Sequence, residues 1–258
     1  MRRLVSAALA AATTRTAYSA LGRVPAVAEG LARENYAGRA VTLLEGPALV
    51  LGLATAGAHG AAYGMAVAGG GVVGLLDDVA GSGSSKGLRG HLRALRRGEV
   101  TTGTLKILGL GATGLTTAVL LDGRDTRVVR TLLGGMLIAG CANLANLLDL
   151  RPGRALKAAA LIGLPLAAAG SAPAAVVAGA GAAALPDDLA GRSMMGDTGA
   201  NAIGAVLGAV LVERSGRLGR LLALTIVVSL TLASETVSFS QVIADTPVLR
   251  RLDAWGRG

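Results

Sequence analysis

The chain has 258 residues, of which 52% are hydrophobic and 16% charged, and its formal net charge is +9. So few charged residues argue against an ordinary soluble domain, which carries roughly 25% of them. One cysteine and two histidines exclude a disulfide framework and a zinc site of ordinary ligand count, so any bound metal must use oxygen ligands. We expect no nucleic-acid partner, because the arginines are not interleaved with aromatic residues and no nucleic-acid-binding motif occurs.

Long uncharged runs predict an all-α fold, a polytopic transmembrane helical bundle that forms a single domain over 1–258. We expect nine spans, near residues 4–21, 41–58, 61–76, 103–121, 128–148, 156–170, 172–186, 198–213 and 219–234. The alternative, a soluble helical bundle, would have too little polar surface to be solvated.

Three of these runs need interpretation. The first could be a cleavable signal peptide, but Arg15 and the two threonines before it interrupt its apolar run, so we interpret it as a retained segment. The stretches 46–76 and 158–186 contain no Asp, Glu, Lys or Arg and are too long for one crossing. Each therefore predicts a helical hairpin with a very short connection.

Lysines and arginines are distributed unevenly between the two sides that this order of spans defines. Most follow the first, third, fifth, seventh and ninth spans. Because cytoplasmic loops carry the excess of positive charge, we expect these loops in the cytoplasm and the N-terminus outside. Two segments on the cytoplasmic side are a basic amphipathic loop, 79–102, and the C-terminal tail, 235–258.

Unusual polar residues gather at span ends on this cytoplasmic side. They are Asp77 and Asp78, then Asn143, Asn146 and Asp149, then Asp187, Asp188 and Asp197, and finally Glu235. Carboxylates at membrane depth are costly and usually pair, bind ions or face a polar cavity, so the set predicts a site. For any single aspartate the alternative is a helix cap or interfacial solvation.

Spacing indicates which of these side chains can converge. Asn143, Asn146 and Asp149 are three residues apart and share one helical face, and Asp197 precedes Asn201 by four. Adjacent Asp77 and Asp78 are about 100° apart on a helix, so they must point in different directions. One can then bind a metal while the other orients it or a substrate group.

The basic segment 86–97 has its leucines on one helical stripe and Lys86 with four arginines elsewhere, which is typical of an interfacial amphipathic helix. It could rest on anionic lipid headgroups, or its cations could hold substrate phosphates. Hard carboxylate and amide oxygens beside such cations suit Mg²⁺ bound by one or two carboxylates and by substrate phosphates. Phosphoryl transfer needs mainly such a metal ion and cations to position and neutralise the phosphates. The absence of a Walker loop argues against an ATP-driven pump.

These motifs resemble the polyprenyl-phosphate N-acetylhexosamine-1-phosphate transferase superfamily over roughly residues 35–242. The likeness rests on GLLDD at 74–78 with KGL at 86–88, NLANLLD at 143–149, MGDTGAN at 195–201, and ETVS at 235–238 with Gln241. The resemblance implies a multi-pass protein of the bacterial inner membrane with a cytoplasmic active site. There a UDP-sugar would donate sugar-1-phosphate to a polyprenyl phosphate with Mg²⁺, for envelope polymer synthesis. A homodimer is also reasonable on this likeness.

The resemblance implies a role for each matching residue. Metal ligands would be Asp197 and Asp77; catalytic acids Asp77, Asp78 and Asp149; and substrate-binding residues Lys86, Asn143, Asn146 and Asn201. The chain departs from the family at 149–157, where DLRPGRALK replaces a repeated Asp-Gly pattern, and it lacks the family's His-rich loop. These departures motivate an alternative, a catalytically degenerate homologue that acts as an envelope-assembly scaffold or lipid-binding partner. An ion or solute transporter is a third hypothesis, since buried acids also serve transport.

Overall fold

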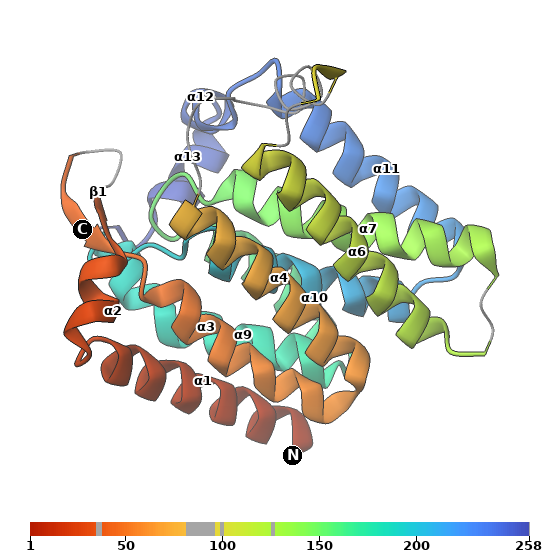
Figure 1. Ribbon diagram of the computed structural model, residues 1–258, viewed down its shortest axis with the longest axis horizontal. Coiled ribbons are helices and arrows are strands. Elements are labelled where there is room, and N and C mark those ends of the chain that lie inside the picture. Colours follow the sequence, from red (N-terminus) through yellow and green to blue (C-terminus); the bar gives the residue numbers. More distant parts are fainter. Residues whose placement is uncertain (35–37, 81–95, 99–100, 125–126, 258) are drawn as a thin grey trace.

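The computed structural model describes residues 1–34, 38–80, 96–98, 101–124 and 127–257. Within these ranges the chain is helical apart from one small β-hairpin, and its longer helices lie side by side (Figure 1). The helices of the first half are α1 (Arg2–Leu21), α2 (Pro25–Gly30), α3 (Glu45–Leu53), the 3₁₀ helix η1 (Ala54–His59), α4 (Ala61–Ala80) and α6 (Thr102–Asp122). Those of the second half are α7 (Val128–Leu148), α8 (Arg154–Ala168), α9 (Ala172–Leu189), α10 (Gly196–Glu213), α11 (Arg217–Ser234), α12 (Phe239–Asp245) and α13 (Pro247–Ala254).

Helix α10 is the centre of the bundle, with every residue from 198 to 210 buried. It packs against α4 on one side and α7 on the other, and glycines allow these backbones to approach closely. A Cβ on Gly74 would lie 2.2 Å from the carbonyl oxygen of Asp197, and one on Gly204 would lie 2.4 Å from that of Cys141. The end of α4 therefore lies directly against the start of α10, where the predicted site residues are.

Among the described residues, three helices, α6, α7 and α11, are long and apolar enough to cross a membrane. The prediction of nine spans is therefore wrong, although a helix forms in each predicted run. Some of the others are too short: α8 has 15 residues, and the run 41–58 is divided between a strand, the 9 residues of α3 and the 6 of η1. The rest include charged residues that lower their mean hydropathy, namely Arg15 in α1, Asp77 and Asp78 in α4, Asp187 and Asp188 in α9, and Asp197 in α10.

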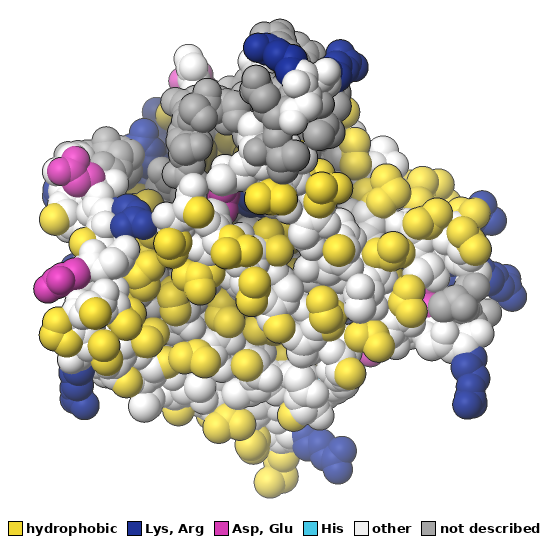
Figure 2. Space-filling model, in the orientation of Figure 1, with side chains coloured by type: hydrophobic (Ala, Val, Ile, Leu, Met, Phe, Trp, Pro, Cys, Tyr) yellow, Lys and Arg dark blue, Asp and Glu magenta, His cyan; other side chains and the backbone are white. Residues whose placement is uncertain are grey.

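The outward faces of α6, α7 and α11 carry exposed leucine, isoleucine and valine side chains. Only 17% of the apolar window of α11 is buried, and the corresponding figure for α6 and α7 is 33%. In Figure 2, hydrophobic side chains cover much of the middle of the visible face, while Lys and Arg side chains lie along its edges. An exposed apolar surface of this kind suits contact with lipid or with another protein.

Both expected helical hairpins are present. The α3–η1 pair turns into α4 at Gly60, whose φ is 144°, and α8 turns into α9 at Gly170, whose φ is 106°. These positive φ values explain glycine at the two turns. Helix α9 continues through Pro186, so Asp187 and Asp188 lie in its last turn and not in the loop that the sequence predicted.

Two features were not expected from the sequence. Strands β1 (Ala32–Glu34) and β2 (Ala40–Thr42) pair antiparallel before α3, and Thr42 also bridges to Ser193. In addition, the predicted tail 235–258 contains α12 and α13. The predicted amphipathic helix at 86–97 lies almost entirely outside the described residues, as does most of the loop 79–102.

A buried ion pair joins the end of α6 to the start of α11. It lies at the other end of α6 from Lys106. The Asp122 carboxylate accepts hydrogen bonds from both terminal nitrogens of Arg220, at 2.7 and 3.0 Å, and from the Thr131 hydroxyl at 2.8 Å. Arg220 is 1% exposed. Asp122 and Arg220 are 98 residues apart along the chain, so local spacing does not predict this contact between helices.

Candidate functional site

Asp77 and Asp78, in the last turn of α4, point to different neighbours, as their spacing on a helix requires. Asp77 Oδ2 accepts a hydrogen bond from Lys106 Nζ at 3.1 Å. Asp78 faces α10: its Oδ1 accepts from the Asp197 backbone N–H at 3.0 Å, and its Oδ2 accepts from Thr198. The two neighbouring carboxylates therefore make different contacts.

Asp78 caps α10 from another helix. The first N–H groups of a helix lack partners within it, and the N-cap residue of α10, Met195, provides no side-chain cap. The Asp78 carboxylate takes that place and also lies at the positive end of the helix dipole. Gly196 allows this approach: its φ is +61°, and a Cβ there would lie 2.9 Å from Asp78 Oδ2.

Lys106 joins Asp77 to Asp197. Its Nζ donates to Asp77 Oδ2 and pairs with Asp197 Oδ2, and its side chain is only 12% exposed. The Asp77 and Asp197 carboxyls also lie close enough to interact with each other. Lys106 was not among the site residues predicted from the sequence. The available signal was its position as a lone cation near the start of an apolar helix, where an ionisable residue is a candidate for function.

Asp149 and Asp188 extend the acidic group. Asp149 ends α7 and accepts a backbone hydrogen bond from Gly196, and Asp188 Oδ2 accepts from the Gly153 N–H at 2.9 Å. Burial raises the pKa of Asp149 well above its ordinary value, and the nearby charges of Asp188 and Asp197 raise it further. Burial also raises the pKa of Asp188, to about 6, against the effect of the Gly153 N–H and two nearby cations.

Burial and neighbouring acids also affect the pKa of Asp197. Burial and its hydrogen bond with Asp77 raise the pKa of Asp197 to about 7, although Lys106 acts in the opposite direction. Carboxylates from α4, α7, α9 and α10 thus lie near enough to disfavour one another's ionised forms. An additional cation would relieve this repulsion, and we define Asp77, Asp78, Asp149, Asp188 and Asp197 as the acidic cluster.

The other predicted site residues differ in what surrounds them. Asn201, one turn after Asp197, is fully buried, and neither atom of its amide has a hydrogen-bond partner among the described residues. Asn143 and Asn146 are partly buried on the last turns of α7, which lead to Asp149. Lys86 lies outside the described residues.

Asp187 pairs with arginines and not with the residues of the acidic cluster. It forms ion pairs with Arg15 of α1 and with Arg192, at 2.7 Å for the second. These two arginines lower its pKa, although burial alone would raise it. Asp187 therefore has its own counter-ions and is not included in the acidic cluster.

The acidic cluster can supply part of a magnesium site. Among the described residues, no three His, Cys, Asp or Glu side chains are grouped so as to hold a metal ion. Asp77 and Asp197 nevertheless converge on one cationic group, the ammonium of Lys106. Because Mg²⁺ is often held by one or two carboxylates, with water and substrate phosphates completing its shell, these two residues fit the protein's share of such a site.

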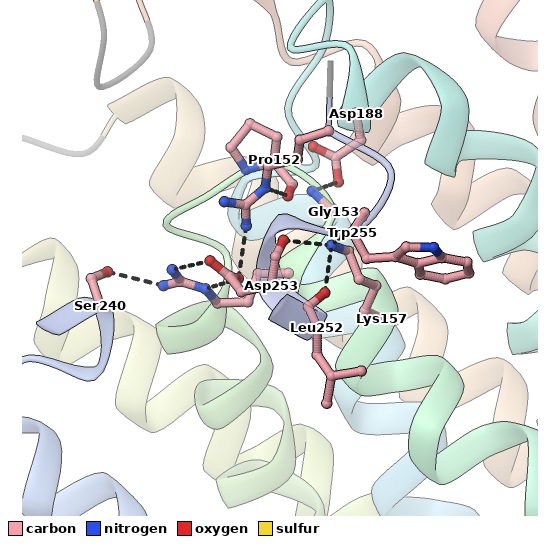
Figure 3. Close-up of polar contacts among 10 residues, drawn as sticks. Pro152, Gly153, Lys157, Asp188, Ser240, Leu252, Asp253 and Trp255 are labelled. Atoms are coloured by element: carbon pink, nitrogen blue, oxygen red, sulfur yellow. Dashed lines mark hydrogen bonds and ion pairs between the residues drawn. The ribbon is translucent and has the colours of Figure 1, made fainter. Parts of the chain in front are cut away.

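Residues of the segment 149–157 bind the C-terminal segment of the chain (Figure 3). Arg154 donates to both carboxylate oxygens of Asp253, at 2.8 and 3.1 Å, and to the Ser240 hydroxyl at 2.9 Å. Lys157 donates to the carbonyl oxygens of Asp253 and Trp255, at 2.6 and 2.8 Å. These two cations therefore join the start of α8 to α12 and α13, beside the acidic cluster.

Comparison of the chain with models of protein families finds no match, and comparison with curated proteins finds none either. The resemblance therefore rests on the sequence motifs at 74–78, 86–88, 143–149, 195–201 and 235–241 alone and stays a prediction.

Proposed function

We propose that this protein is a magnesium-dependent transferase that moves sugar-1-phosphate from a UDP-sugar to a polyprenyl phosphate at the cytoplasmic face of a bacterial inner membrane. The observation that carries the proposal is the convergence of Asp77 and Asp197, from α4 and α10, on the ammonium of Lys106. Asp149 of the acidic cluster lies near enough to Asp197 for the charge of Asp197 to raise its pKa. Carboxylates from separate helices that meet at one point can share a divalent ion bound to a diphosphate.

The apolar helices support a lipid substrate. The start of α6 carries Lys106 and the end of α7 carries Asp149, so the acidic cluster lies at one end of these helices. Exposed large apolar side chains line α6 and α11, and those of α7 lie in its first half. A polyprenyl chain in the bilayer could then lie beside these helices while its phosphate reaches the cluster.

The proposed reaction is one phosphoryl transfer. An oxygen of the polyprenyl phosphate attacks the sugar-bearing phosphorus of the UDP-sugar, the bond from that phosphorus to the bridging oxygen breaks, and UMP leaves. Asp77 and Asp197 would hold Mg²⁺, which supplies neutralisation of the diphosphate charge. Lys106 would donate hydrogen bonds to phosphate oxygens. Asp149, whose pKa is raised by burial and by its acidic neighbours, would accept the proton of the attacking phosphate.

A specific observation favours the second candidate, a degenerate homologue that acts as a scaffold or lipid-binding partner. Lys106 already pairs with both Asp77 and Asp197, and Arg154 and Lys157 are engaged by the C-terminal segment. An arrangement with its own internal counter-ions does not need a metal or a nucleotide to be stable.

The two candidates are separated by measuring UMP release from UDP-sugars by the purified chain with undecaprenyl or decaprenyl phosphate, with Mg²⁺ or EDTA. The transferase predicts Mg²⁺-dependent release that falls at least about 100-fold in Asp197→Asn. The matched control is Asp187→Asn, which makes the same change at an aspartate outside the acidic cluster and should keep most activity. No release with any UDP-sugar, together with unchanged binding of polyprenyl phosphate by Asp197→Asn, would favour the scaffold.

A further inference from the structure

The two cations that hold the C-terminal segment, Arg154 and Lys157, lie in the first turn of α8 (Figure 3). They are three residues apart, so their side chains share one face of the helix. The N-terminus of a helix is its positive end, where an anion is favourable and a cation is not. The first turn of α8 holds no acid, and its N-cap residue, Gly153, makes no side-chain cap. Two cations at this end therefore suit the binding of an anion and not the stability of the helix.

A carboxylate of the chain itself already occupies this surface. Arg154 donates to both carboxylate oxygens of Asp253, from Nε at 2.8 Å and from a terminal nitrogen at 3.1 Å. Arginine uses the same two-point contact to bind a phosphate group. The Arg154 residue is 6% exposed, so water screens this contact little. The start of α8 therefore recognises an anionic group that presents two oxygens.

Lys157 has weaker partners than Arg154. In the described part of the chain it donates to three backbone carbonyl oxygens, those of Leu252, Asp253 and Trp255. Burial lowers the pKa of Lys157, and the positive charges of Arg257 and Arg154 lower it further, although two nearby aspartates act in the opposite direction. A phosphate oxygen carries more negative charge than a carbonyl oxygen, so a phosphate would bind this ammonium more strongly.

The C-terminal segment is held on the bundle mainly by these polar contacts. No residue of α12 or α13 is buried, and most are exposed, so little hydrophobic free energy fixes the two helices in place. Arg257 adds a hydrogen bond to the carbonyl oxygen of Pro152 at 2.8 Å. A ligand that takes Arg154 and Lys157 would therefore remove most of what holds the segment.

We propose that Arg154 and Lys157 bind the diphosphate of the nucleotide sugar, and that Asp253 occupies this place as an internal competitor until the diphosphate arrives. A diphosphate offers one phosphoryl group to each of the two cations. The site adjoins the acidic cluster, because the Gly153 N–H donates to Asp188 at 2.9 Å. The C-terminal segment is then autoinhibitory: it weakens diphosphate binding and is released when the diphosphate binds. This inference rests on the proposed function for the identity of its ligand, but its test needs no turnover.

The binding test uses labelled UDP and the full chain in detergent, by equilibrium dialysis in EDTA at constant ionic strength. Asp253→Asn removes the competing charge and should tighten UDP binding by at least about fivefold. Lys157→Gln leaves the pair of Arg154 and Asp253 in place and should weaken UDP binding by about tenfold or more, because it removes a charged hydrogen-bond donor. The matched control is Asp245→Asn, the same change at an exposed position of the same segment, which should bind UDP like the unsubstituted chain.

Release of the segment is measured in the same samples by the fluorescence anisotropy of Trp255, the only tryptophan. UDP and inorganic pyrophosphate should lower this anisotropy at neutral pH, whereas inorganic phosphate at equal ionic strength should have much less effect. In Asp253→Asn the anisotropy should be low from the start and should not respond to UDP. Undecaprenyl phosphate in the same micelles distinguishes a lipid phosphate from a nucleotide. Release by this lipid but not by UDP would overturn the assignment to a nucleotide sugar.

Equal UDP affinity in Asp253→Asn and in the unsubstituted chain would overturn the competition, and unchanged affinity in Lys157→Gln would overturn the site. If Lys157→Gln does not fold, the comparison of Asp253→Asn with Asp245→Asn still decides. The failure of this inference is distinct from that of the proposed function. A chain that releases UMP while Asp253→Asn leaves UDP binding unchanged contradicts only the inference, and a chain that binds UDP as expected but releases no UMP contradicts only the transferase.

Discussion

Asp78 Oδ2 accepts two hydrogen bonds from Thr198, one from its backbone N–H at 2.9 Å and one from its hydroxyl at 2.6 Å. This contact joins the last turn of α4 to the first turn of α10. It places Asp77 and Asp197 on either side of Lys106. Asp78 is therefore a positioning residue in this structure, whatever further role it has in catalysis.

The first prediction concerns this cap. Asp78→Ala removes the only side-chain cap found for α10 in the described residues and should lower stability by about 1–2 kcal/mol. That corresponds to a fall in Tm of roughly 2–8 °C in the full chain. Asp245→Ala, on an exposed position of α12, is the control and should leave Tm nearly unchanged. Equal effects of the two substitutions would show that the cap contributes nothing.

Lys106 allows a test of whether Asp77 and Asp197 share one cation. Lys106→Met keeps most of the side-chain volume but leaves two partly buried carboxylates without their ammonium, which should cost about 2–3 kcal/mol in EDTA. Mg²⁺ should restore most of the lost stability, because it can occupy the same position between the carboxylates. Thermal unfolding with and without Mg²⁺ measures this. A variant that Mg²⁺ stabilises no more than the unsubstituted chain would contradict a shared site.

The ion pair of Asp122 and Arg220 should behave as a buried pair. Arg220→Met leaves the Asp122 carboxylate without its main partner and should destabilise the chain by about 3–5 kcal/mol. The double variant Arg220→Met with Asp122→Leu should recover much of this loss, because the buried pair is removed whole and only Arg130, which is 30% exposed, loses its contact with Asp122. A double-mutant cycle by thermal unfolding checks the recovery, and strictly additive losses would argue against the pair.

The C-terminal segment should detach from α8 in acid. Burial tends to raise the pKa of Asp253, but hydrogen bonds from Arg154 and Arg257 lower it below its ordinary value of 3.8. A depressed carboxyl pKa gives stability that is present above the unfolded pKa and is lost as pH falls through the folded pKa. The segment should therefore stay bound at neutral pH and be released only below about pH 4.

Trp255 reports this release because it is the only tryptophan of the chain and its carbonyl oxygen binds Lys157. Its fluorescence anisotropy should fall between about pH 4 and pH 2, since the segment becomes free to move as Asp253 is protonated. Asp253→Asn should give the low anisotropy already at pH 7, while Asp245→Asn should titrate like the unsubstituted chain. A transition that persists in Asp253→Asn would mean that other carboxyls control it.

Several features were predicted correctly because they depend on short stretches of sequence. The length of the two uncharged stretches gave both helical hairpins, and the 100° step between adjacent residues gave the divergence of Asp77 and Asp78. The nine spans were wrong because several of the predicted runs form helices that are too short or that include charged residues, and these helices lack the length or mean hydropathy of a membrane span. The catalytic and metal roles of the acidic cluster stay predictions.

The sequence by itself determined the helices and which residues could share a helical face, because both depend on the order of a few neighbouring side chains. Only the tertiary structure decided the partners: Lys106 for Asp197, Asp78 for the start of α10, and Arg154 for Asp253. These pairs are separated by 91, 119 and 99 residues along the chain. Their contacts depend on how glycine-lined helices pack, which local periodicity does not encode.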